Sequence, residues 1–349
     1  MNNKIIKTFI LVTLLAVLVA VASASEVSTD TTSTPTTVDV PDDVVGMDTT
    51  PSVVEDTTPT TTGTLQESVT SKQIENNEII KEEKNKKTAY FDVSSSDDLR
   101  TAFDSTNEEV TVNIIADITL YINPSLNPDI NTLTIEGNGH TINGSNTHRF
   151  LDIESRTTVN IKNLTITNCY YIGDGGAIYN NGTLTITNSN LTHNTATQWG
   201  GAINNNHGTL TINNSNLNNN TQWGGAIHQY YGTLYITNSN LTHNNATTRG
   251  GAIDNEYGIV TIAHSNFNYN TAVYGGAIFN LGIDVDWADW GTLTITDSNL
   301  THNTATQWGG AINNDNFATL NITNSNLNYN TANDGGAIIN SGTLNITKS

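Results

Sequence analysis

A four-residue motif, Gly-Gly-Ala-Ile, recurs seven times in this chain and constrains its fold more than any other feature. Its first residues are Gly175, Gly200, Gly224, Gly250, Gly275, Gly309 and Gly335, at spacings of 25, 24, 26, 25, 34 and 26 residues. A period of this size is typical of a solenoid, in which each turn buries its apolar face only against its neighbours. The repeat therefore favours an extended binding surface over a single deep pocket.

Each repeat contains three strand-like stretches, which in one repeat cover residues 176–180, 183–187 and 189–194. Leu184 and Ile186 alternate with threonines, so their side chains share one face. Three strands per coil of about 25 residues predict an all-β parallel β-helix, whose equivalent residues stack about 4.8 Å apart. The residue after the motif's isoleucine varies widely among the repeats, as at Asn204, His228 and Asp254, and we expect this position to face water.

Stacking predicts columns of equivalent residues. Leu184 and Ile178 each begin an apolar column, and Asn194 begins an asparagine column whose amides can bond to each other and to turn backbone. The single cysteine, Cys169, excludes an intramolecular disulfide, and we place it in a column of small residues that continues at Ser189.

The start of the chain resembles an export signal. Residues 1–24 contain Lys4 and Lys7, an apolar run and a cleavage motif that ends at Ala24. A membrane anchor is the alternative, although the run is shorter than a spanning helix needs. No second apolar segment follows, so we expect a secreted mature chain without a membrane span.

The composition changes twice along the rest of the chain. Residues 25–87 are rich in Thr, Ser, Pro and acidic side chains, which predicts a disordered stalk or linker. Residues 88–170 are expected to form a cap and irregular first coils, with a short helix near 96–103 that Ser95 or Ser96 would cap. Residues 171–349 hold the regular coils. Their last turn has no cap, which predicts a longer gene product or end-to-end self-association.

The charge excludes one class of partner. The formal net charge is −20, and basic residues are not clustered after Lys87, so we expect no nucleic-acid binding. The sequence gives no cofactor motif, and we expect no cofactor and no dedicated metal site.

The residues just before each Gly-Gly pair form a column of candidate ligand contacts, which includes Trp199, Trp223, Arg249, Tyr274 and Trp308. Aromatic faces and arginine stack on sugars and also on one another. The column therefore predicts either a ladder that only stabilises the coil or a platform for a glycan or peptide.

An insertion at 283–290 interrupts the period and adds two more candidate contacts, Trp287 and Trp290. Its acids, Asp284, Asp286 and Asp289, are weak calcium candidates because their spacing matches no defined calcium loop. A solvated variable loop is the alternative.

Asp254 and Glu256 are the one pair of carboxylates placed for hydrolysis, about 6.6 Å apart along one strand and near Arg249. They are also weak calcium candidates. Acidic residues are usually solvated, and no other turn supports such a site, so we expect no enzymatic activity. Three histidines, at 193, 243 and 302, share a column about 9.6 Å apart, too far for a zinc site. Asn245, in an Asn-Ala-Thr sequon that we place in a loop, is the best glycosylation candidate.

The paired motifs carry a resemblance over about residues 133–349. Gly-Gly-Ala-Ile together with Phe267-x-x-Asn270 resembles the repeat of chlamydial polymorphic outer-membrane proteins, and the Asn- and Thr-rich repeats are similar to adhesin-like proteins of methanogenic archaea. The resemblance implies a pectate-lyase-like, right-handed β-helix at a cell surface, with a role in adherence to host, microbial or glycan ligands. A structural cell-envelope protein, or a lyase or hydrolase acting on acidic glycans, are the alternatives.

Overall fold

The structure is a computed structural model that describes residues 87–222, 224–284 and 291–349. The proposed signal peptide and all but the last residue of the proposed stalk lie outside the described residues. None of the helices in the described part is long and apolar enough to cross a membrane.

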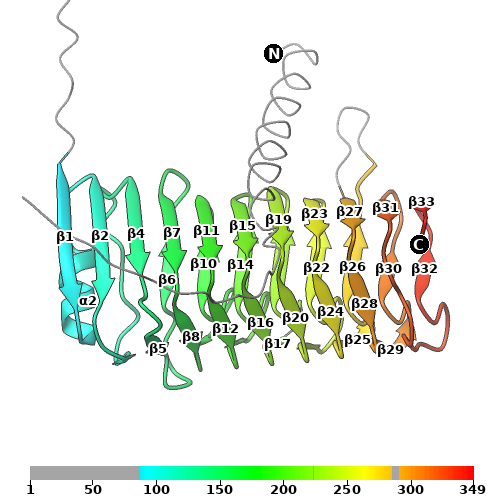
Figure 1. Ribbon diagram of the computed structural model, residues 1–349, viewed down its shortest axis with the longest axis horizontal. Helices are drawn as coiled ribbons and strands as arrows, with labels where there is room; N and C mark the ends of the chain where they lie inside the picture. The colour runs from blue at the N-terminus through cyan, green and yellow to red at the C-terminus, as the bar shows by residue number, and fades with distance from the viewer. Residues whose placement is uncertain (1–86, 223, 285–290) are drawn as a thin grey trace, which may run out of the picture. The chain divides into compact units, whose positions relative to one another are not determined.

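The described chain forms a parallel β-helix, as predicted, with its coils stacked side by side (Figure 1). Sheet A collects the central Thr-Leu-Thr-Ile-Thr stretches. Its eleven strands are β1 (Thr88–Val93), β2 (Glu109–Ile114), β4 (Thr132–Glu136), β7 (Thr158–Lys162), β11 (Thr183–Thr187), β15 (Thr209–Asn213), β19 (Thr233–Thr237), β23 (Ile259–Ala263), β27 (Thr292–Thr296), β31 (Thr319–Thr323) and β33 (Thr343–Thr347).

Sheets B and C contain the other two predicted strands of each coil. Sheet B consists of β3 (Ile118–Thr119), β5 (Thr141–Asn143), β8 (Thr165–Thr167), β12 (Asn190–Thr192), β16 (Asn216–Asn218), β20 (Asn240–Thr242), β24 (Asn266–Asn268) and β28 (Asn299–Thr301). Sheet C consists of β6 (Leu151–Ile153), β10 (Ile178–Asn180), β14 (Ile203–Asn206), β18 (Ile227–Tyr230), β22 (Ile253–Glu256), β26 (Ile278–Leu281), β30 (Ile312–Asn314) and β32 (Ile338–Asn340).

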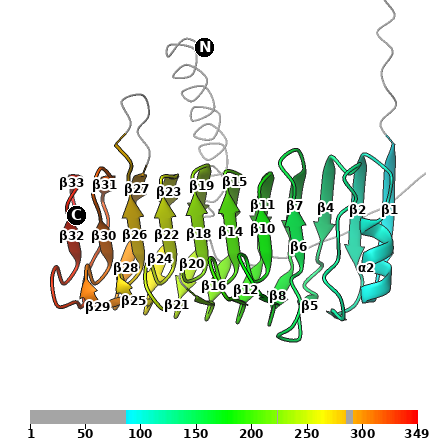
Figure 2. The same ribbon diagram turned by 180° about the vertical axis from the view of Figure 1, so that it is seen from behind.

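A fourth, short strand per coil was not predicted. Sheet D contains β9 (Tyr170–Tyr171), β13 (Thr195–Ala196), β17 (Thr221–Gln222), β21 (Asn245–Ala246), β25 (Thr271–Tyr274) and β29 (Thr304–Trp308). Along the chain, its strands lie between the asparagine column and the Gly-Gly pair, as Thr195–Ala196 does between Asn194 and Gly200. Figure 2 shows β21, β25 and β29 beside one another in successive coils. They carry little alternation because most span two residues, which explains why the sequence pattern did not reveal them.

The predicted columns are present and in register. Leu184 pairs with Leu210, and Ile178 pairs with Ile203, each in parallel neighbours. These side chains are buried inside the coil. Asn194 is also buried, and its Nδ2 donates to Asn220 Oδ1 over 3.1 Å, as the asparagine column predicted.

Cys169 belongs to a different column from the one expected. Its backbone N–H donates to Asn194 Oδ1 over 2.9 Å, so it heads the asparagine column, whereas Leu164 stands before Ser189. Residues 158–167 form two short strands, β7 and β8, and not one longer strand, because Asn163 adopts a left-handed φ of 52°.

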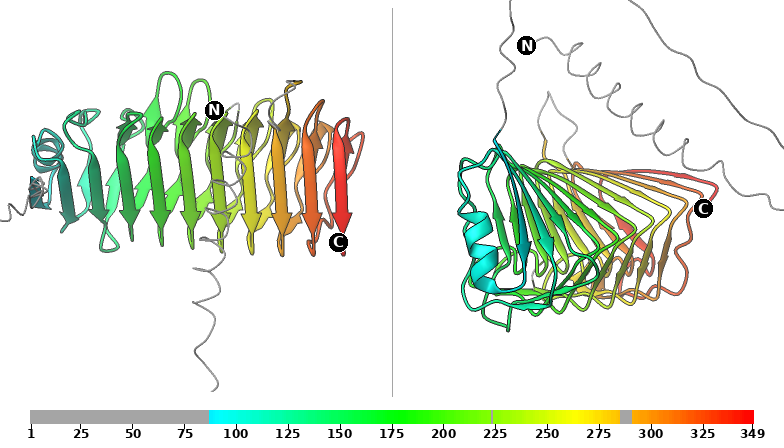
Figure 3. Two further views of the ribbon diagram at one scale, coloured as in Figure 1. Left: turned by 90° about the horizontal axis from the view of Figure 1, so that it is seen from above. Right: turned by 60° about the vertical axis from the view of Figure 1, so that its left-hand side comes forward.

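One short helix, α2 (Ser96–Phe103), covers the first coil beside β1 and β2 (Figure 3). Ser95 is its N-cap, and the Ser95 side chain accepts a hydrogen bond from the Asp98 N–H over 3.1 Å. Leu99, Ala102 and Phe103 are buried against the first coils, as their spacing predicted.

Candidate functional site

The outer face of sheet C is the candidate site, and it is covered by the protein's own chain. Asn204, His228 and Asp254 follow the motif's isoleucine and were predicted to face water, but all three are buried. The prediction was wrong because two residues that precede a Gly-Gly pair, Trp199 and Arg249, fold back over this face. The first glycine makes that return possible: Gly250 has φ 55°, and a Cβ there would lie 1.9 Å from the Ile253 carbonyl oxygen.

Trp199 is one of the returning side chains. Its ring stacks on the His228 ring, with centroids 4.7 Å apart and planes at 23°. His228 lies on β18, and the same strand presents Tyr230, whose ring stacks on His228 at 6.2 Å. The histidine is therefore held between two aromatic rings.

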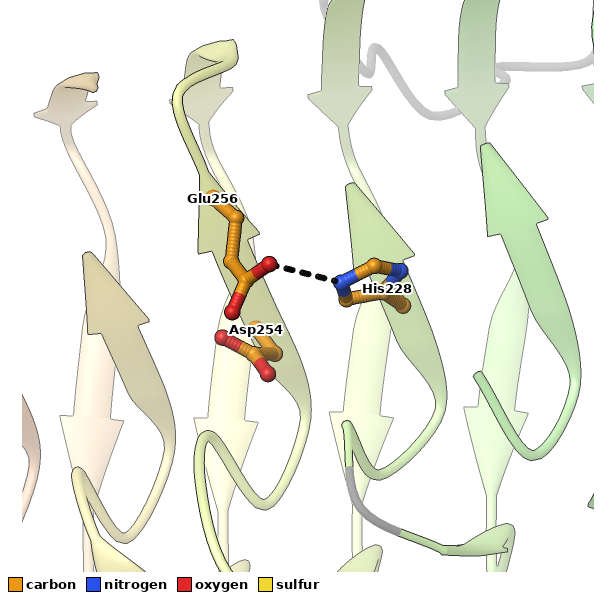
Figure 4. Close-up of side chains that lie close together, drawn as sticks. All are labelled: His228, Asp254 and Glu256. Carbon is orange, nitrogen blue, oxygen red and sulfur yellow. Dashed lines mark ion pairs between the residues drawn. The ribbon is translucent and has the colours of Figure 1, made fainter. Parts of the chain in front are cut away.

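Asp254 and Glu256 lie on β22, the next strand of sheet C. Asp254 pairs with His228 in the parallel register. Contrary to the expectation of solvated carboxylates, the Asp254 side chain is 0% exposed and the Glu256 side chain 14%. Glu256 Oε2 lies 3.7 Å from His228 Nε2, across the gap between the two strands (Figure 4).

Arg249 is the counter-charge for both carboxylates. Its Nη2 lies 3.4 Å from Asp254 Oδ2 and hydrogen-bonds Glu256 Oε1. The guanidinium also lies 5.3 Å from the Trp199 ring and 4.9 Å from the Phe279 ring. Arg249 was a predicted ligand contact, and here its charge is directed toward the protein's own acids.

The electrostatics of these groups follow from burial and proximity. Burial raises the pKa of Asp254 to about 7, although Arg249 and His228 oppose the change. Burial would also raise the pKa of Glu256, but the nearby His228 and the charge of Arg249 lower it overall. The pKa of Arg249 is raised, because Asp254 and Glu256 outweigh the effect of its burial.

A small pocket opens beside this cluster. Its volume is about 200 Å³, and its lining comprises Asp174, Trp199, Asn204, Asn206, His228, Tyr230 and Glu256. Aromatic rings, amides and carboxylates thus meet at one place, which is the set of groups that recognises polar ligands with one apolar face.

The rest of the predicted column lies further along the solenoid. Tyr274 and Trp308 contact each other, with ring centroids 5.0 Å apart, and Trp308 is 44% exposed. Trp223 lies outside the described residues. The structure therefore gathers Trp199 and Arg249 beside the pocket, whereas Tyr274, in the coil next to Arg249, pairs with Trp308 in the following coil.

The structure also contains a ring column that the sequence analysis missed. His243, Tyr269, His302 and Tyr329 stack at an exposed corner with centroids 4.9–5.1 Å apart. The histidines of this column occupy alternate coils, and the tyrosines fill the coils between and after them. The signal was available, because each ring directly precedes the asparagine column.

The remaining candidates occupy surface positions or lie outside the described chain. Asp284 is exposed, whereas Asp286, Trp287, Asp289 and Trp290 lie outside the described residues. Asn245 is exposed but lies in strand β21 rather than in a loop, where its Oδ1 accepts a hydrogen bond from Thr271 Oγ1 over 2.8 Å.

No known protein family, curated protein or solved structure matches this chain.

Proposed function

We propose that this chain is an exported, adhesin-like protein of the cell surface that uses the outer face of its β-helix to bind glycan or protein ligands. The observation that carries the proposal is the pocket where Trp199 and Tyr230 lie beside Asp174, Asn206 and Glu256. Aromatic rings contact the apolar face of a sugar, and carboxylates and amides accept or donate hydrogen bonds to its hydroxyls.

The pocket is smaller than the usual site for a drug-sized ligand, which fits contact with one sugar ring or one side chain at a time. Further contacts are available along the solenoid at the exposed Trp308. Weak sites on one rigid scaffold gain avidity when they engage a repeating ligand together. The similarity of the repeats to those of surface adhesins supports the same function.

A structural envelope protein is the second candidate. It is favoured by the extent to which side chains bond to one another from coil to coil, as in the buried asparagine column. In that case the aromatic rings would stabilise the coils and bind nothing. An enzyme acting on acidic glycans is less favoured, because Asp254 is fully buried and ion-paired with Arg249.

Binding of the full chain to a glycan array and to whole cells tests the proposal. The test variant combines Trp199→Ala with Trp308→Ala, and the matched control is Tyr329→Ala, which removes a more exposed ring from a different corner. We expect the test variant to lose binding and the control to retain it, while circular dichroism shows both to be folded.

If the wild-type chain, the double variant and the control bind equally, the aromatic column does not take part in binding. Absence of binding in every protein, with a loss of stability in the test variant, would favour the structural candidate. Release of unsaturated or reducing sugar from acidic glycans, abolished in Arg249→Ala, would favour the enzyme.

A further inference from the structure

Three potential metal ligands converge beneath Trp199. They are His228, Asp254 and Glu256, and one ligand atom from each lies within 4.8 Å of the other two. Figure 4 shows the three side chains directed into one space, the histidine from β18 and the acids from the neighbouring β22. Two hydrogen-bonded parallel strands fix the positions of all three, so the arrangement does not depend on a flexible loop.

Three polar atoms in this space lack hydrogen bonds. Both carboxylate oxygens of Asp254 and the Nε2 of His228 are buried without a hydrogen-bond partner. Buried polar groups are nearly always satisfied, and each exception is destabilising. Arg249 supplies a single positive charge for two carboxylates. A second cation would satisfy the remaining lone pairs and the remaining charge.

The environment of the His228 ring suits a metal ligand. The Nδ2 of Asn204 lies 3.4 Å from the Nδ1 of His228, and the Oδ1 of Asn204 is buried without a hydrogen-bond partner. Rotating the amide by half a turn exchanges the two atoms, so that Oδ1 accepts a hydrogen bond from a protonated Nδ1. The Nε2 lone pair then faces the two carboxylates, as in metal sites where the outer ring nitrogen is held by a hydrogen bond.

We propose that His228, Asp254 and Glu256 bind a divalent transition metal of the zinc type. One imidazole and two carboxylates form a three-ligand set, and they leave a fourth position toward the pocket for water or a ligand oxygen. Donors around tetrahedral zinc lie about 3.4 Å apart for bonds of about 2.1 Å, close to the 3.7 Å between His228 Nε2 and Glu256 Oε2. Calcium would require six to eight oxygens.

The Arg249 guanidinium would compete with a metal ion for the two carboxylates. Its guanidinium contacts the same two carboxylates, and its side chain is 21% exposed, so it can turn outward when a metal enters. Removing this guanidinium is therefore expected to strengthen metal binding. The metal site does not require that the protein be an adhesin, and zinc binding can be measured without any glycan.

Calorimetric titration of the chelator-treated full chain with zinc chloride tests the site. We expect saturable binding of one zinc ion, unaffected by equal concentrations of magnesium or calcium. His228→Ala and Glu256→Gln should each lower the zinc affinity at least about tenfold. A tenfold loss is the lower end of the range for a residue that only hydrogen-bonds to a metal ligand. Asn204→Ala should weaken zinc binding by about 10–100-fold, and Arg249→Gln should strengthen it.

Two controls distinguish this site from other zinc binding. Asp152 forms a similar pair with Arg149 in the same column of sheet C, over 2.7 Å, without a facing histidine, so Asp152→Asn should not change the affinity. His243→Ala removes an exposed histidine from the ring column and should also have no effect.

Absence of saturable binding to the wild-type chain would overturn the proposal. Full affinity in a folded His228→Ala variant, or loss of binding only in His243→Ala, would overturn it as well. If circular dichroism shows that His228→Ala does not fold, the zinc affinity of Glu256→Gln is the test. Glu256 lies at the edge of the pocket and is less buried than His228, so this variant is expected to fold.

Discussion

The buried asparagine column should make a large contribution to the stability of the solenoid, and Asn244 allows a direct test. Its Oδ1 accepts hydrogen bonds from the backbone N–H and the Nδ2 of Asn220, over 3.0 and 3.1 Å. Its Nδ2 donates to the Leu217 carbonyl over 2.8 Å and to Asn270 Oδ1 over 3.1 Å. Asn244→Ala removes these four hydrogen bonds from a site that is closed to water.

The size of the expected stability loss depends on which hydrogen bonds the partners of Asn244 keep in the variant. The Asn220 amide still donates to the Leu191 carbonyl, and Asn270 Oδ1 still accepts from the Asn244 backbone. The Asn220 backbone N–H loses its acceptor, at a cost of about 1–3 kcal/mol, and the other lost bonds add about 1 kcal/mol each at most. We expect Asn244→Ala to lower the free energy of unfolding by about 1–6 kcal/mol.

Urea denaturation followed by circular dichroism measures this loss, and hydrogen exchange shows whether protection falls first in the coils around Asn244. The control is Asn245→Ala at the next residue, which is exposed and accepts one hydrogen bond, from Thr271. We expect the control to change stability by less than about 0.5 kcal/mol. A loss below about 1 kcal/mol for Asn244→Ala, or equal losses for the two variants, would refute the reasoning.

Three further outcomes are expected. Cys169 is buried and burial raises its pKa to about 12, so a thiol reagent at pH 8 should label it only after denaturation; fast labelling of the native chain would contradict its placement. Gly250→Ala should lower stability by at least about 1–3 kcal/mol from its left-handed φ alone, with a further clash against the Ile253 carbonyl, and an unchanged melting temperature would argue against that turn. Phe103→Ala should cost about 3–5 kcal/mol by unfolding the cap, whereas Tyr90→Ala, on an exposed side chain, should cost little, and similar thermal shifts for both would count against a packed cap.

Repetition made the fold predictable from the sequence. Thr183–Thr187 and its equivalents alternate strictly, so the same positions point inward and outward in each coil. The register between Leu184 and Leu210 follows from the period. The short strands of sheet D escaped this logic because two residues cannot show an alternation. The interruption between β7 and β8 escaped it because asparagine tolerates a left-handed φ without a change in the surrounding pattern.

The sequence also brought the site together without revealing its environment. Equal spacing placed His228 beside Asp254 in one column, and the two-residue spacing placed Glu256 on the same side of the strand. Alternation says only that such residues point away from the coil interior, which is normally into water. Whether water actually reaches them depends on what the chain does elsewhere.

By itself, then, the sequence determined the β-helix, its register and the columns of equivalent residues, because these follow from a repeated local pattern. Only the tertiary structure decided that the outer face of sheet C is covered, since this depends on the glycine turns that return Trp199 and Arg249 over the neighbouring strands. That covering removes water from Asp254 and His228 and converts surface-like residues into a buried, charged cluster. The physical reason is that burial is a property of three-dimensional neighbours, and these neighbours come from adjacent coils, about 25 residues away in the chain.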